Sequence, residues 1–222
     1  MSRSASPGPH EGQKHLIWGD TTSAKVVVVF LHGRGSTPEQ DLPAFEATFE
    51  KADNGTGQVA AVFMRAQDEA WFSEHWNIPR KAQEPFISSA IAEVHKTIHG
   101  LPVPPSCVVL AGFSQGATVS LCYALEHPEV ELGHIFALSG SIIGAPRDFG
   151  DSGRVISTRI SICWGSQDRY YKPVKVEQDV NGLQDRGADV KVDLLPMGHW
   201  ICQPELDTLS EMIARVLEQA KM

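Results

Sequence analysis

The chain has 222 residues, of which 42% are hydrophobic, and this is enough to bury the core of one domain. Its formal net charge of −8 and the lack of any Lys/Arg cluster argue against nucleic acid as the main partner. The longest strongly apolar run, Val26 to Leu31, is too short to cross a bilayer, so we expect no stable membrane anchor. The four cysteines fit no zinc pattern, and three lie in apolar segments, which indicates reduced thiols and a cytoplasmic location.

Short apolar runs alternate with longer segments of helical spacing along the chain. Residues 1–15 are rich in Ser, Pro, Gly and His and predict a flexible tail, and residues 16–222 predict a single domain. The expected strands are Val26–Leu31, Val59–Phe63, Cys107–Ala111, His134–Leu138, Arg159–Trp164 and Val190–Leu194. The expected helices are Pro38–Ala52, Glu84–His99, Gln115–Glu126, Pro173–Arg186 and Pro204–Lys221. The predicted fold class is α/β, a mostly parallel central sheet with helices on both faces and no large lid domain.

Two connections are long and unassigned. Met64–Gln83 is rich in aromatic residues, and Ser139–Thr158 is rich in Gly and Ser. Each follows an expected strand, and the loops at the carboxyl ends of parallel strands form the binding site in open α/β sheets. We therefore expect both connections to lie at that edge of the sheet.

A candidate nucleophile lies in Gly112-Phe113-Ser114-Gln115-Gly116, directly after the apolar run Cys107–Ala111. A strand, then Gly-x-Ser-x-Gly, then a helix is the context of a nucleophile elbow. The glycines relieve crowding at the strained turn, and the Ser114 hydroxyl is held at a helix N-terminus, where developing negative charge is favoured. The alternative is an ordinary tight turn.

A serine hydroxyl needs a base, and in α/β hydrolases the acid and then the base follow the serine in the chain. Three histidines follow Ser114. His127 lies at the end of a helix and His134 at the start of a strand, whereas His199 lies in a turn between the last strand and the last helix. We expect His199 to be the base, and a surface loop histidine is the alternative.

The expected acid is Asp168, directly beyond the strand Arg159–Trp164. The next strand leads to His199, so the two loops are neighbours. Asp148 and Asp151, one loop earlier, are the rivals, and they resemble ordinary solvated carboxylates. Asp168 would orient His199 and stabilise its imidazolium form.

Attack of a serine on an acyl carbon turns the carbonyl oxygen into an oxyanion, and this oxyanion needs two hydrogen-bond donors. The main-chain N–H of Gln115, the residue after the nucleophile, is one candidate. The second is the main-chain N–H of Arg34 in His32-Gly33-Arg34-Gly35, which follows the first expected strand. We interpret His32 as structural, and the Arg34 side chain as pointing into solvent or, alternatively, meeting an anionic substrate group.

With these residues in place, the chain resembles the acyl-protein thioesterase and carboxylesterase family, the phospholipase/carboxylesterase group of α/β hydrolases. The matching segments are Phe30–Gly35, Ala111–Gly116, Leu138–Gly140, Gly165–Asp168 and Met197–His199. By matching position, the resemblance implies Ser114 as nucleophile, Asp168 as acid, His199 as base, and Arg34 and Gln115 as oxyanion donors. It implies a substrate that is a carboxylic ester or a thioester, either a small molecule or an acylated protein, and no cofactor or metal.

The chain departs from the family where Trp200 follows His199, since many relatives carry a small polar residue there. We expect Trp71, Phe72, Trp76 and Trp200 to shape a substrate pocket, and ordinary packing aromatics are the alternative. The sequence therefore predicts a serine esterase or thioesterase with an acyl-enzyme on Ser114. The other hypotheses are a specialised esterase, lactonase or acyl transferase for a metabolite, or a hydrolase fold that only binds a ligand.

Overall fold

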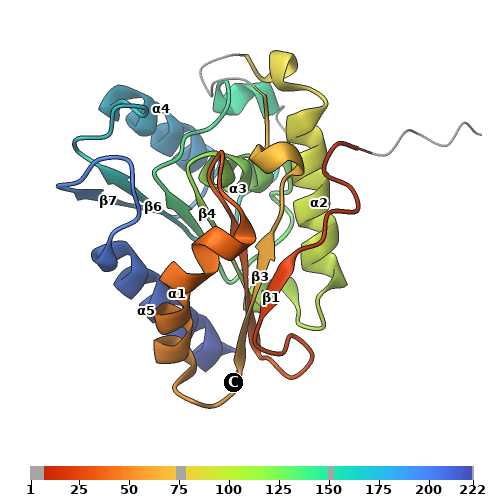
Figure 1. Cartoon of the computed structure of the whole chain (residues 1–222). Coiled ribbons are helices and arrows are strands. Elements are labelled where there is room, and N and C mark those ends of the chain that lie inside the picture. The colour runs from red at the N-terminus through yellow and green to blue at the C-terminus, as the bar shows by residue number, and fades with distance from the viewer. Residues whose placement is uncertain (1–7, 74–78, 150–152, 222) are drawn as a thin grey trace, which may run out of the picture.

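A seven-stranded sheet forms the centre of the molecule (Figure 1). The structure is a computed structural model that describes residues 8–73, 79–149 and 153–221. The strands lie in the order β1-β3-β2-β4-β5-β6-β7, and only β1 runs antiparallel to its neighbour. Their bounds are β1 Leu16–Trp18, β2 Val26–Leu31, β3 Val59–Met64, β4 Val108–Phe113, β5 His134–Leu138, β6 Ile160–Gly165 and β7 Val190–Leu195.

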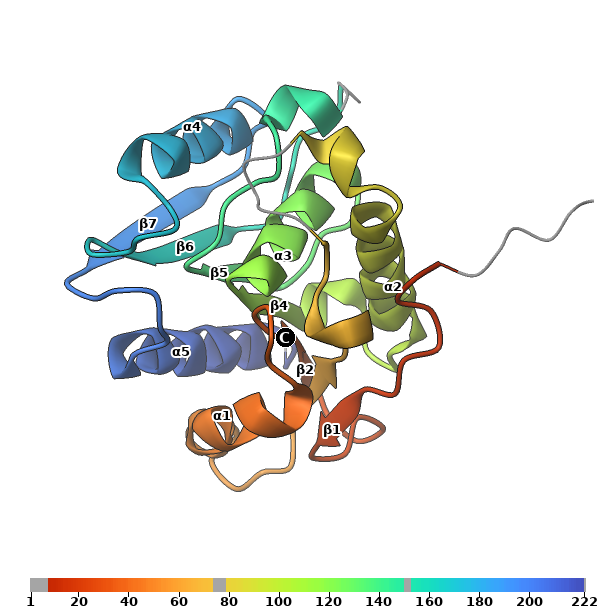
Figure 2. The same cartoon turned by 45° about the horizontal axis from the view of Figure 1, so that its top comes forward.

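Helices cover both faces of the sheet (Figures 1 and 2). The α-helices are α1 Pro38–Asp53, α2 Phe86–Gly100, α3 Gln115–Glu126, α4 Pro173–Gln184 and α5 Gln203–Gln219. Helices α1 and α5 lie side by side on one face, and α2, α3 and α4 lie on the other. Short 3-10 helices are η1 Gln67–Glu69, η2 Arg80–Gln83, η3 Pro105–Cys107 and η4 Pro146–Phe149. This is the predicted α/β-hydrolase fold, and the described residues include no large lid.

Strand β2 explains why the sheet needs a helix layer on each side. All six of its residues are buried. Val28 and Phe30 belong to the hydrophobic cluster that contains α1 and α5, whereas Val29 and Leu31 belong to the cluster that contains α2, α3 and α4. Because successive side chains of a strand point to opposite faces, a continuously apolar strand must be covered twice.

Helix α1 begins at Pro38, where the expected helix Pro38–Ala52 begins. Thr37 is the N-cap and Pro38 the first helical residue, and Gln40 completes a capping box by accepting a hydrogen bond from the Thr37 N–H at 3.0 Å. Helix α1 is the next element after β2, so this cap marks the end of the loop that carries Gly33 and Arg34.

Strand β1 was not predicted, and it directly follows the expected tail. Residues 1–7 of that tail lie outside the described residues. In residues 8–15, His10 is fully buried, its Nε2–H donates to the Trp71 carbonyl at 2.9 Å, and its Nδ1 accepts from the Gln67 N–H at 3.1 Å. This segment therefore packs against the connection that follows β3. Among the described residues, no helix is long and apolar enough to span a membrane.

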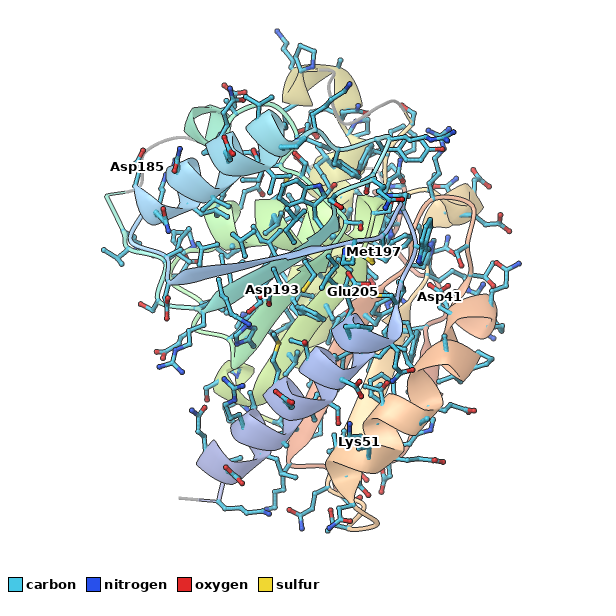
Figure 3. The ribbon with its side chains drawn as sticks, turned by 90° about the vertical axis from the view of Figure 1, so that its left-hand side faces the viewer. Asp41, Lys51, Asp185, Asp193, Met197 and Glu205 are labelled. Atoms are coloured by element: carbon cyan, nitrogen blue, oxygen red, sulfur yellow. The ribbon has the colours of Figure 1, made fainter. Side chains whose placement is uncertain are left out.

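Helix α5 begins with a buried carboxyl group. Glu205, labelled in Figure 3, is 1% exposed, and its Oε2 accepts a hydrogen bond from the Cys202 N–H at 2.9 Å. Its Oε1 is buried without a hydrogen-bond partner in the described part of the chain. Burial raises the pKa of Glu205 to about 7.

The raised pKa of Glu205 predicts that the protein loses stability as the pH rises. Between the ordinary Glu pKa and about 7 the unfolded chain has released this proton and the folded chain still holds it. Glu205→Gln keeps a cap acceptor and cannot ionise. We expect the variant to be more stable than the wild type at pH 8, by on the order of 1–3 kcal/mol, and to match it at pH 4, below the ordinary Glu pKa. Urea unfolding at the two pH values measures this difference, and equal pH dependence in both proteins would contradict it.

Candidate active site

Ser114 lies on a strained turn between β4 and α3. Its backbone has φ 55° and ψ −115°, a region that residues with side chains rarely adopt. A Cβ on Gly112 would lie 2.4 Å from the main chain of Gly116, and a Cβ on Gly116 would lie 2.1 Å from the Leu31 carbonyl oxygen. Only glycine fits at either position, so the predicted elbow geometry is present.

His199 joins Ser114 to Asp168. Its Nε2 lies 2.9 Å from Ser114 Oγ, and its Nδ1 lies 2.8 Å from Asp168 Oδ2. The Asp168 side chain is fully buried, and its Oδ1 also accepts from the N–H groups of Tyr170 and Tyr171 at 2.8 and 3.2 Å. A carboxylate surrounded by donors requires the proton of His199 on Nδ1, which leaves Nε2 to accept from the Ser114 hydroxyl.

The loops after β6 and β7, which carry Asp168 and His199, are held together by backbone contacts. Ser166 donates its N–H to the Leu195 carbonyl at 2.8 Å, and Gln167 donates to the Met197 carbonyl at 2.9 Å. A Cβ on Gly165 would lie 2.2 Å from the Met197 oxygen. Met197 lies between β7 and α5, as Figure 3 shows. The spacing of Asp168 and His199 is thus set by the main chain.

Three aromatic rings surround the imidazole of His199. The ring centroids of Phe113, Tyr170 and Tyr171 lie 4.9, 4.8 and 5.7 Å from that of His199. Tyr171 is 3% exposed, and its hydroxyl interacts with the side chains of Ser114 and Thr118. Burial raises the pKa of Tyr171 to about 12, so this hydroxyl stays protonated. Sequence reasoning missed both tyrosines, although they follow Asp168 within three positions.

Two main-chain amides beside Ser114 have no hydrogen-bond acceptor among the described residues. Within the described residues, neither the Arg34 N–H nor the Gln115 N–H donates a hydrogen bond. Gln115 is the first residue of α3, where an N–H has no acceptor within the helix. The Arg34 side chain is exposed, and its Nη1 donates to the Ser73 carbonyl at 3.1 Å.

Buried hydrogen bonds brace the loop that carries Arg34. His32 is 1% exposed, and its Nδ1–H donates to the Gly33 carbonyl at 2.7 Å while its Nε2 accepts from the Ala66 N–H at 3.1 Å. The Trp71 indole N–H donates to the His32 carbonyl at 2.8 Å, and the Trp71 main-chain N–H donates to Gln115 Oε1 at 3.0 Å. His32 is therefore structural, as predicted. The side chain of Gln115 holds the connection after β3 beside the elbow.

The rival site residues that the structure describes lie away from the Ser114–His199 pair. Asp148 accepts from the N–H of Ala145 in its own loop at 2.8 Å. Asp151 lies outside the described residues. His127 is the C-cap of α3, and the Nε2 of His134 lies 2.9 Å from Ser161 Oγ on β6.

Of the four aromatic residues predicted to line the pocket, the three that the structure describes do not all lie together. Trp71 and Phe72 are 0% and 1% exposed and belong to the hydrophobic core, which corrects their prediction as pocket walls. Trp76 lies outside the described residues. Trp200 is 55% exposed and stands beside His199 at the rim of a cavity. No group of three His, Cys, Asp or Glu side chains that could hold a metal ion occurs in the part of the chain that the structure describes.

The chain is similar to known proteins over almost its whole length. Residues 14–217 match the family described as Phospholipase/Carboxylesterase. No curated protein sequence matches the chain. The phospholipase/carboxylesterase of Dyadobacter fermentans is 27% identical with a TM-score of 0.79, covering 91% of this chain and 96% of that one. Acyl-protein thioesterase 2 of Zea mays is 16% identical (TM-score 0.75, 92% and 99% covered), and the Bacillus cereus carboxylesterase is 17% identical (TM-score 0.68, 93% and 95% covered), so these two support the fold alone.

The close approach of the two loops at Gly165 predicts that Gly165→Ala is destabilising. The added methyl would overlap the Met197 carbonyl, so we expect the free energy of unfolding to fall by about 1–3 kcal/mol. Gly100→Ala is the matched control, because a Cβ there meets nothing within 4 Å. Urea unfolding of both variants tests this, and equal stabilities would show that the loops can separate freely.

Proposed function

The chain belongs to the phospholipase/carboxylesterase family of α/β hydrolases, and we propose that it is a serine hydrolase that cleaves a carboxylic ester or thioester through an acyl-enzyme on Ser114. The observation that carries this proposal is the position of the His199 ring, which lies 2.9 Å from Ser114 Oγ and 2.8 Å from Asp168 Oδ2. A weak nucleophile, a base and an orienting acid in this arrangement are the elements of serine acyl transfer.

In the proposed first half-reaction, Ser114 Oγ attacks the acyl carbon and His199 Nε2 takes the hydroxyl proton. The carbonyl oxygen becomes an oxyanion, for which the free N–H groups of Arg34 and Gln115 are the donors. The tetrahedral intermediate then collapses, the bond from the acyl carbon to the leaving oxygen or sulfur breaks, and His199 transfers the proton to that atom. Asp168 stabilises the imidazolium throughout.

In the second half-reaction, water replaces the alcohol or thiol. His199 takes a proton from the water, the hydroxyl oxygen attacks the acyl carbon, and the Ser114 ester bond breaks with return of the proton to Ser114. The products are the carboxylic acid and free enzyme. The thioester branch of the proposal draws on the resemblance to a thioesterase fold, and the same groups serve both substrates.

Ser114→Ala is expected to abolish hydrolysis. With p-nitrophenyl esters of increasing acyl length, kcat should fall on the order of 10⁴-fold or more, since removing a triad member has that effect in serine hydrolases. Ser106→Ala, at an exposed serine in η3, is the matched control and should keep wild-type kcat.

An organophosphonate probe separates the other results of this assay. Labelling of wild-type Ser114 without turnover of any ester points to a narrower substrate than these esters. Neither turnover nor labelling, in folded protein, overturns the proposal in favour of a ligand-binding protein.

Asp168→Asn distinguishes the proposed acid from its rival. The amide can donate to His199 Nδ1 and so favours the wrong tautomer, for which we expect kcat to fall by about 10³–10⁴-fold. Asp148→Asn, in the η4 loop, is the matched control and should leave kcat within about twofold. Similar losses in both variants would mean that Asp168 has been given the wrong role.

A further inference from the structure

A cavity of about 470 Å³ opens beside His199. Its lining comes from the loops after β6 and β7. We call it the aromatic hollow, and its lining residues are Gln167, Arg169, Tyr170, Gly198, His199 and Trp200. Ser114, Arg34 and Gln115 do not line it. The hollow therefore adjoins His199 and not the main-chain amides of Arg34 and Gln115.

Two large aromatic side chains stand open to solvent at the aromatic hollow. Tyr170 is 58% exposed and Trp200 is 55% exposed. The Trp200 indole packs directly against the Gly198 backbone, since a Cβ on Gly198 would lie 2.3 Å from the ring. Exposed but positioned aromatic rings beside a reactive group are suited to stack on a planar ligand.

The aromatic hollow also carries one positive charge. Arg169 is exposed, and it has no ion-pair partner within residues 8–73, 79–149 and 153–221. No carboxylate lines the hollow, since the side chain of Asp168 is fully buried and faces His199. In a chain of net charge −8, this guanidinium is placed to pair with an anionic ligand group.

The proposed reaction places the acyl half and the leaving-group half of the substrate on different sides of the site. The acyl oxygen must face the amides of Arg34 and Gln115, whereas the leaving oxygen or sulfur must come within hydrogen-bond reach of His199 Nε2 to receive its proton. The leaving group thus departs on the His199 side, where the aromatic hollow lies. We propose that the aromatic hollow binds the alcohol or thiol half of the substrate, and that it takes a planar aromatic group with an anionic substituent that pairs with Arg169. This inference rests on the proposed function.

Four acetate esters with similar leaving groups test the inference: benzyl, cyclohexylmethyl, 4-carboxybenzyl and, as the neutral analogue of the last, 4-carbamoylbenzyl acetate. The wild type should show a kcat/KM for benzyl at least tenfold above that for cyclohexylmethyl, and a further gain from the carboxylate over the carbamoyl group. Trp200→Ser should reduce the benzyl preference by about tenfold, and Arg169→Gln should remove only the carboxylate preference. Val155→Ser and Arg215→Gln, at exposed positions outside the hollow, are the matched controls.

Unchanged ratios in both hollow variants, with hydrolysis still dependent on Ser114, would overturn the subsite and leave the proposed function standing. A changed preference for acyl length in Trp200→Ser, measured with a fixed alcohol, would also overturn it by placing the acyl half in the hollow. Binding of 4-(hydroxymethyl)benzoate to Ser114→Ala protein gives a readout that needs no turnover. When Trp200→Ser is added to Ser114→Ala, we expect the dissociation constant to rise about tenfold. An unchanged constant would contradict the inference, whether or not the proposed reaction takes place.

Discussion

Ser114 has a backbone conformation, φ 55° and ψ −115°, that a residue with a side chain keeps only when its surroundings hold it there. Such strain costs about 1–3 kcal/mol, and the hydrogen bonds and packing around the turn offset it. Ser114 donates its N–H to the Leu138 carbonyl at the end of β5, and the Ser114 carbonyl accepts from the Thr118 N–H in the first turn of α3. Gly112 and Gly116 let α3 approach the sheet closely enough for both contacts to form. The Ser114 hydroxyl can therefore project toward His199 because β4, α3 and β5 together hold this turn in one conformation.

The two sides of the site are braced by different means. On the side of Arg34, buried side chains make the connections: His32, Trp71 and Gln115 link the loops after β2 and β3 to the start of α3. Unpaired buried polar groups are costly, so each of these hydrogen bonds limits where the free amides can lie. On the side of His199, main-chain contacts across the loops after β6 and β7 set the geometry, and large side chains remain exposed there. Buried side chains therefore brace the Arg34 side, whereas exposed aromatic side chains lie on the His199 side.

Much of this arrangement follows from local sequence. Continuous apolar runs must be strands covered on both faces, and their alternation with helical segments leaves a parallel sheet as the consistent solution. Once Ser114 is placed at a strand-to-helix turn, chain order and the neighbouring loops leave Asp168 and His199 as partners. The three-residue strand β1 gave no such signal, because a short edge strand needs only one partner and little apolar sequence.

The sequence by itself therefore determined the fold class, the order of the α-helices and of the strands after β1, and the residue types that meet at the carboxyl edge of the sheet. Tertiary structure alone decided which aromatic residues face solvent. Trp71 and Trp200 both lie in connections that follow strands of the sheet, yet Trp71 is buried by contacts with His10, His32 and Gln115, and Trp200 is turned outward against Gly198. Burial of a loop side chain depends on partners tens of residues away in the chain, so no local pattern encodes it. A strand or a strand-to-helix turn, by contrast, depends on consecutive residues, and this is why the sequence could place Ser114, Asp168 and His199 together but not predict the surface around them.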